Sequence, residues 1–190
     1  MKIFQILASL TLTVAATAAV ASEPVTVFGL SLGGKLRPSF RQCLMKEIGT
    51  DVRTLCWISP PGMYHGWRSG WIIVPGESSR PSWAAHGSFE ATVAKDGTLG
   101  ELRVKTSDPD KYIDIFTSIN SRFGPPSSTN TVIQKRAYLA SWDRSDIKIE
   151  LACSPEIKCY TTFTSPNRAA FVAREKSAAK AKEAARPLVP

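Results

Sequence analysis

The 190-residue sequence is poor in the residues and motifs that most often carry out catalysis or bind metal ions. It has only two histidines, His65 and His86, and its four cysteines form no C-x-x-C pair. It also contains no H-E-x-x-H or P-loop motif. We therefore expect no cofactor, no metal ion and no catalytic residues in this protein.

No apolar run after residue 21 is long enough to span a bilayer. Residues 1–21 have the plan of a secretory signal peptide: Lys2, an apolar run, and a small-residue end at Ala19-Val20-Ala21. An uncleaved membrane anchor is the alternative. No cysteine follows Ala21 directly, which argues against a lipid anchor. The sequence thus predicts cleavage after Ala21 and a periplasmic protein that does not span the membrane.

The four cysteines, Cys43, Cys56, Cys153 and Cys159, all follow the predicted signal peptide. An even number of cysteines in an oxidising compartment is typical of disulfides, and three pairings are possible. We favour Cys43–Cys56 and Cys153–Cys159, because each pair brackets a short segment that contains a turn. Loops of these lengths would contribute about 3 and 2 kcal/mol to the free energy of unfolding.

The formal net charge is +8 at pH 7, and much of the positive charge lies near the C-terminus. Residues 166–190 read as an alanine-rich helix followed by a tail, whose basic residues include Arg174, Lys176, Lys180, Lys182 and Arg186. For an exported protein such charge favours contact with anionic lipid or cell-wall polymer rather than nucleic acid. A solvated basic helix without a partner is the alternative.

Apolar spacing predicts the other elements. Residues 109–123 place apolar side chains along one helical face, and residues 88–104 form a hairpin around Asp96-Gly97. A second helix is expected at residues 38–48. We expect the first turns of the C-terminal helix to pack on the domain and the rest of that helix to project. Further strands are expected at residues 25–30, 71–74, 131–134, 137–142, 146–153 and 160–164.

These elements predict an α+β protein: an antiparallel sheet with helices packed on one face, plus a projecting C-terminal helix. In residues 146–153 the apolar positions alternate with Lys148 and Glu150, so one face of the sheet should meet water. The expected organisation is a signal peptide at 1–21, one domain at 22–165, and the basic helix and tail at 166–190.

Residues 112–151 join a helix ending in Arg122-Phe123-Gly124-Pro125-Pro126 to strands that carry Trp142 and Ile147-Lys148-Ile149. This stretch resembles the repeat unit of small bacterial envelope proteins. They include outer-membrane assembly lipoproteins of the small-protein-A type and the β-lactamase-inhibitor-protein-like fold. Residues 28–34 resemble the start of a preceding unit. The chain lacks the lipidation cysteine of the assembly lipoproteins, so the resemblance implies the fold and a non-catalytic, protein-binding role.

Residues 57–89 hold four of the five tryptophans and both histidines. We single out Tyr64, His65, Trp67, Arg68 and Trp83 as candidate binding residues, because aromatic faces beside arginine can hold a peptide or a sugar. The alternative is that these rings form a local core under a long loop. We expect Trp71 in the core and Trp67 and Trp83 exposed.

Together these features predict an exported, non-catalytic periplasmic protein that binds another envelope component, with a protein as the expected partner. One alternative is a cell-wall-active or ester hydrolase that uses His65 or His86. Another is a carrier of a small apolar or sugar ligand in the aromatic region.

Overall fold

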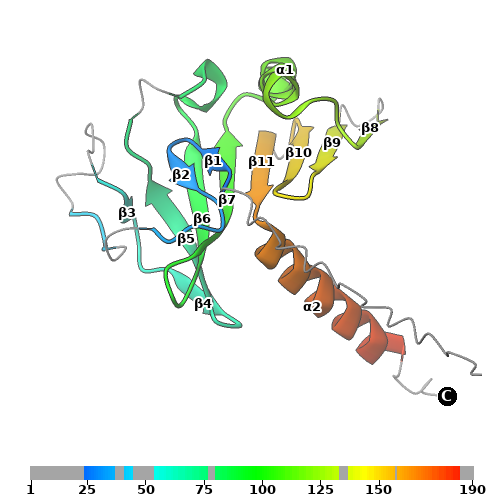
Figure 1. The fold of residues 1–190 in the computed structure, drawn as a ribbon. Helices are drawn as coiled ribbons and strands as arrows, with labels where there is room; N and C mark the ends of the chain where they lie inside the picture. The colour runs from blue at the N-terminus through cyan, green and yellow to red at the C-terminus, as the bar shows by residue number, and fades with distance from the viewer. Residues whose placement is uncertain are drawn as a thin grey trace, which may run out of the picture.

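The computed structural model describes residues 24–36, 41–44, 54–76, 80–132, 137–156 and 158–184. This part of the chain forms a nine-stranded antiparallel sheet, a separate two-stranded hairpin and two α-helices (Figure 1). The predicted α+β class is confirmed. The predicted signal peptide and its cleavage site lie outside the described residues.

The elements have these bounds in chain order: β1 (Thr26–Val27), β2 (Leu30–Ser31), β3 (Cys56–Trp57), β4 (Gly62–Tyr64), β5 (Trp67–Ile73), β6 (Ser88–Ala94), β7 (Leu99–Thr106), α1 (Tyr112–Phe123), β8 (Ser128–Val132), β9 (Ala137–Asp143), β10 (Lys148–Ser154), β11 (Lys158–Thr164) and α2 (Pro166–Ala184). Short 3-10 helices occupy Ser82–Ala84 and Pro109–Lys111. The order in the large sheet is β3-β5-β6-β7-β11-β10-β9-β8, with β4 beside β5. The last strand, β11, therefore pairs with β7 at the centre and joins the two halves of the chain.

The β6–β7 hairpin confirms the strongest local pattern in the sequence. Gly97 has a φ of 88°, and the Asp96 carboxylate accepts a hydrogen bond from the backbone N–H of Thr98 at 3.1 Å. The register shifts between Thr92 and Val93, so that Gly100 becomes an extra residue in β7. The carbonyl oxygen of Gly100 accepts the backbone N–H of Ser165, just before the C-terminal helix, so the bulge lies beside the start of that helix.

Helix α1 also forms where the sequence predicts it. A 3-10 turn precedes it, and the Asp108 carboxylate accepts the backbone N–H of Asp110 at 2.9 Å. Ile115 and Ile119 are fully buried against the sheet, as the apolar stripe requires. Gly124, with a φ of 77°, ends the helix.

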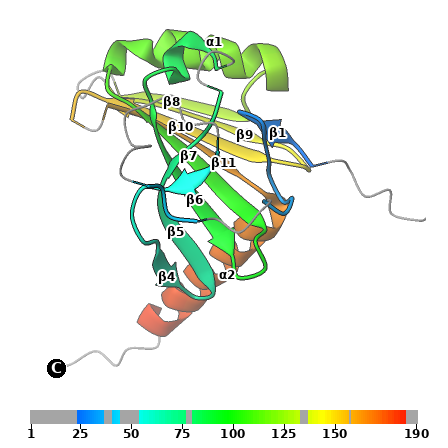
Figure 2. The same ribbon diagram turned by 90° about the vertical axis from the view of Figure 1, so that its left-hand side faces the viewer.

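The two helices lie on opposite faces of the sheet (Figure 2). Leu102 and Val104 of β7 join Ile115 and Ile119 in the core, so we name this side the core face. Because side chains alternate along a strand, Arg103 points to the other side, which we name the open face. Helix α2 begins directly after β11 and projects away from the sheet, as the sequence predicts for this helix.

Two sequence-based expectations about local structure are wrong. Residues 25–30 are not one strand: β1 and β2 form a tight hairpin whose turn, Phe28-Gly29, has positive φ at both residues. A phenylalanine in this conformation costs roughly 1–2 kcal/mol, which its ring packing must offset. Of the expected helix at 38–48 the structure describes residues 41–44, which are extended and pair with β3 at Trp57.

Both favoured disulfides are present. Cys43 and Cys56 are joined, and Cys153 is joined to Cys159 across the β10–β11 turn, where the two residues are register partners. The first disulfide fastens the extended segment at 41–44 to β3 at the edge of the sheet. The second closes the turn between β10 and β11, two strands near the middle of the sheet.

Candidate functional site

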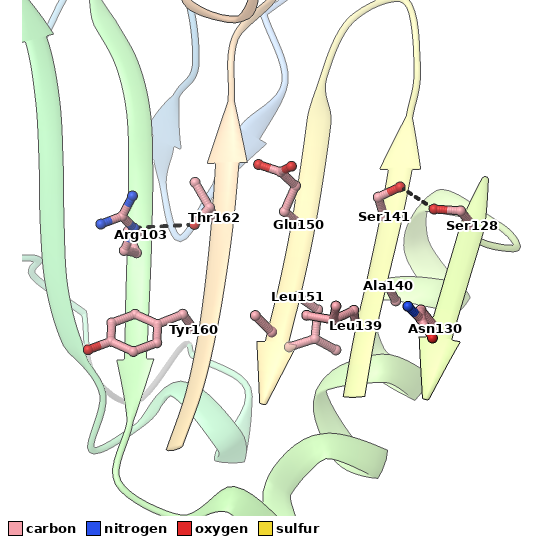
Figure 3. Close-up of a pocket in the computed structure, with 11 residues that line it drawn as sticks. Arg103, Ser128, Asn130, Leu139, Ala140, Ser141, Glu150, Leu151, Tyr160 and Thr162 are labelled. Atoms are coloured by element: carbon pink, nitrogen blue, oxygen red, sulfur yellow. Dashed lines mark hydrogen bonds between the residues drawn. The ribbon is translucent and has the colours of Figure 1, made fainter. Parts of the chain in front are cut away.

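Two rows of side chains cross five neighbouring strands on the open face (Figure 3). The strand register places the first row in the order Lys105, Tyr160, Ala152, Leu139 and Asn130. The second row runs in the order Arg103, Thr162, Glu150, Ser141 and Ser128. The middle of the first row is apolar and the second row is polar, so the surface carries two parallel stripes of different chemistry.

Arg103 is the best-anchored side chain of the polar row. Its Nη1 donates to Glu90, its Nη2 to Glu101 and its Nε to Thr162, each at 3.3 Å. The guanidinium is therefore held flat against the strands by three partners. A group fixed in this way can offer a partner its remaining donor capacity with little further loss of side-chain freedom.

The surface between these rows is hollowed. The hollow has a volume of about 540 Å³ and spans β7 to β8. A second hollow of about 500 Å³ lies between the sheet and α2, with Glu101 and Lys148 on the sheet side and Ala169 and Ala173 on the helix. Both hollows are lined by Glu150, so they adjoin each other on the open face.

The apolar row is only partly shielded. Leu139 is 43% exposed, and the Lys105 ammonium lies 5.4 Å from the centre of the Tyr160 ring. Tyrosine and arginine, which share this face with the exposed Leu139, are enriched at the centres of protein-binding surfaces. Among the described residues no group of three His, Cys, Asp or Glu could hold a metal ion.

Four of the five candidate residues chosen from the sequence lie together on the β4–β5 hairpin. The rings of Tyr64 and His65 stack with centroids 4.2 Å apart, and Arg68 and Trp67 follow in β5. His65 Nδ1 lies 2.8 Å from a carboxylate oxygen of Glu175 in α2. The hairpin is thus a docking point for α2, and in the described part of the chain no serine hydroxyl is bonded to the His65 ring.

The first two turns of α2 pack on this hairpin through Trp67. The Arg168 guanidinium lies 4.9 Å from the centre of the Trp67 ring and 5.3 Å from that of Phe171. Trp67 and Phe171 also contact each other, with centroids 6.0 Å apart. The expectation that α2 docks by its first turns is confirmed, and Trp67 is half-buried by that contact rather than presented to solvent.

The expectations about Trp83 and Trp71 are wrong. Trp83 is only 5% exposed, and its ring packs edge-on against Phe28 from the β1–β2 hairpin, at 5.7 Å between centroids. Trp71 is 38% exposed, because it points to the open face. Trp83 therefore lies in the core, apart from the β4–β5 hairpin.

The predicted basic residues Arg174, Lys176, Lys180 and Lys182 are all exposed on α2, whereas Arg186 lies outside the described residues. At 100° per residue, Lys176 and Lys180 share one side of the helix, and Arg174 and Lys182 lie on other sides. The charge therefore surrounds the projecting part of α2 instead of forming one basic stripe.

Burial raises the pKa of Glu101 above its usual range, and the guanidinium groups of Arg103 and Arg168 oppose this shift. A raised carboxyl pKa means that the folded state binds the proton more tightly than the unfolded state. The resulting stabilisation is fully present at low pH and is lost as pH rises from the unfolded pKa through the raised one. We expect Glu101→Gln to remove this loss, measured as urea midpoints between about pH 4 and 7.

Glu90→Gln is the control for this measurement, because Glu90 also pairs with Arg103, at 3.3 Å. If both variants change the pH dependence equally, the change comes from the loss of any carboxylate beside Arg103. In that case the interpretation based on the burial of Glu101 is wrong.

No protein-family model, no curated protein and no solved structure matches this chain. Among the described helices none is both long enough and apolar enough to cross a membrane. No pattern in the sequence indicated Arg103, Tyr160 or Leu139 as residues of a binding surface. The alternation in residues 146–153 predicted a face in contact with water, but it could not indicate which strands would lie side by side to form the two rows.

Proposed function

We propose that this is an exported, non-catalytic protein that binds another envelope protein through the open face of its sheet. The observation that carries the proposal is the pair of rows: an exposed apolar stripe beside a polar stripe with an anchored arginine. Two disulfides and the leader-like residues 1–21 support export. The resemblance to small-protein-A lipoproteins and β-lactamase-inhibitor-like proteins agrees with a protein partner.

The dimensions of the rows suit a single secondary-structure element of a partner. Five strands spaced about 4.8 Å apart give a row about 19 Å long. An amphipathic helix of about 13 residues has this length, at 1.5 Å per residue. Its apolar side would lie on Tyr160, Ala152 and Leu139, and its polar side would meet Arg103 and Glu150.

The alternatives have less support. A hydrolase using His65 would need a nucleophile beside that ring. His65 is instead paired with Glu175 of α2, where the helix packs on the β4–β5 hairpin. His86 is exposed in the turn that follows the 3-10 helix Ser82–Ala84. Contact with anionic lipid or cell wall through the exposed lysines of α2 is proposed as a secondary attachment. The carrier alternative has support from a separate cavity on the core face, which is lined in part by Trp83.

A photo-crosslinking amino acid placed at three positions tests the partner-binding face. Leu139 lies on the open face, Tyr64 on the β4–β5 hairpin, and Ile113 on the solvent side of α1, with exposed fractions of 43%, 61% and 70%. We expect irradiation of cells that export the protein to give a discrete protein adduct from position 139. We expect none from the other two positions.

Matched substitutions complete the test. Leu139→Asp should weaken partner capture at least tenfold, whereas Ile113→Asp, an equally polar change on the opposite side, should leave capture unchanged. Adducts at position 64 alone would move the binding surface to the hairpin and contradict the proposal. A variant ending at residue 176 shows separately whether the projecting helix contributes.

A further inference from the structure

We propose that the core face contains a site for a small anionic amphiphile, between the β1–β2 hairpin and α1. The site would take a carboxylate with an apolar chain of medium length. It lies on the opposite side of the sheet from the rows on the open face, and it is independent of the proposed protein-binding function.

The site is a cavity of about 240 Å³. Its apolar wall is formed by Phe28, Trp83, Ile119, Phe123 and Phe163. These residues come from the β1–β2 hairpin, the 3-10 helix before β6, helix α1 and strand β11, so the cavity lies where four elements meet (Figure 1). A partly open cavity with an apolar wall of this kind favours an apolar ligand body.

Among the described residues, the cavity has a single charged lining residue, Arg122. Arg122 is exposed and therefore marks the mouth. Its Nη2 donates to the carbonyl oxygen of Thr26, and its guanidinium lies 5.1 Å from the centre of the Phe123 ring. Within the described ranges, no carboxylate forms an ion pair with Arg122 and no acidic residue lines the cavity. An unneutralised arginine at the mouth of an apolar cavity selects an anionic head group.

The volume sets the length of the apolar part. A cavity of 150 Å³ is known to accommodate benzene, with six carbons, so about 240 Å³ suits roughly eight to ten carbons. Straight-chain carboxylates such as octanoate fit this range. A sugar does not fit the wall equally well, because among the described lining residues only Thr26, Ser118, Arg122 and the Trp83 indole offer polar side-chain atoms.

Two further features concern the wall itself. Phe28 has a φ of 50°, a conformation that phenylalanine rarely adopts, and its ring contacts Trp83, Phe89 and Phe163 edge-on. Strained residues of this kind are enriched at ligand sites. The buried indole N–H of Trp83 has no hydrogen-bond partner in the described part of the protein. A ligand oxygen that reached the Trp83 indole would satisfy this buried donor.

Calorimetric titration with octanoate and with 1-octanol tests the proposal on the full chain. We expect octanoate to bind with one-to-one stoichiometry and at least tenfold more tightly than the neutral alcohol. Arg122→Gln should weaken octanoate at least tenfold and leave octanol unchanged. Lys111→Gln removes one positive charge from the start of α1, away from the cavity, and should change neither affinity.

The indole N–H resonance of Trp83, assigned with Trp83→Phe, locates the ligand. It should shift on addition of octanoate, whereas binding at the exposed lysines of α2 would leave it in place. Ser118→Phe, which narrows the cavity from the side of α1, should abolish binding of both ligands. If that variant does not fold, the octanoate affinity of Arg122→Gln and the Trp83 resonance still test the proposal. Equal affinity for acid and alcohol, no saturable binding, or an unmoved resonance would each overturn the proposal.

Discussion

Trp142→Ala should destabilise the protein by about 3–5 kcal/mol, a large part of the 5–15 kcal/mol typical of a domain. Trp142 is completely buried in β9, and its ring packs on Phe116 of α1 with centroids 5.6 Å apart. Its indole N–H donates to the carbonyl oxygen of Gly124 at 2.9 Å. The substitution therefore opens a cavity and also leaves the C-terminal cap of α1 without its partner.

Urea unfolding of the oxidised protein measures this effect, with Trp71→Ala as the matched control. Trp71 is 38% exposed on the open face, so its removal should cost less than about 1 kcal/mol. Trp142→Phe should fall between the two, because it keeps one buried aromatic ring but loses the hydrogen bond and the rest of the indole. Similar losses for Trp142→Ala and Trp71→Ala would show that the α1–sheet interface is not the main core.

The parts of the fold that the sequence predicted are those with a complete local pattern. Helix α1 carries an uninterrupted apolar stripe and a Gly-Pro-Pro stop, and the β6–β7 hairpin has Asp96-Gly97 at its turn. The tight turn of the β1–β2 hairpin was not predicted, because Phe28 is not a residue that favours positive φ. Its conformation is held by contacts with Trp83, Phe89 and Phe163, all more than 50 residues away in the chain.

The candidate site depends even more on distant pairing. Tyr160 becomes a neighbour of Lys105 only because β11 returns to pair with β7, and no local pattern specifies that return. The same pairing puts Arg103 beside Thr162. The density of aromatic residues in the sequence indicated Trp67 and Trp83 equally as exposed binding residues. The structure separates them: Trp67 supports α2 on the open side, and Trp83 lines the core.

Gly100→Ala should release α2 from the β4–β5 hairpin. A Cβ atom at Gly100 would lie 2.2 Å from Cζ3 and 2.8 Å from Cη2 of Trp67, so the rigid ring has to move. Trp67 is the ring on which Arg168 and Phe171 of α2 pack. We expect a loss of about 1–3 kcal/mol in the free energy of unfolding, as for other overpacked sites. Faster tryptic cleavage after Arg168, Arg174 and Lys176 should accompany it.

The double variant Trp67→Ala/Gly100→Ala distinguishes this steric cause from an effect on the β-bulge. Without the ring, the new methyl group meets no indole, so Gly100→Ala should cost little in the Trp67→Ala background. The coupling between the two substitutions should then exceed about 1 kcal/mol. Gly62→Ala in β4 is the control, because its nearest neighbour would be the Ser69 carbonyl oxygen at 3.9 Å. Additive losses would instead mean that Gly100 is required by the backbone of β7 and not by the fit of the Trp67 ring.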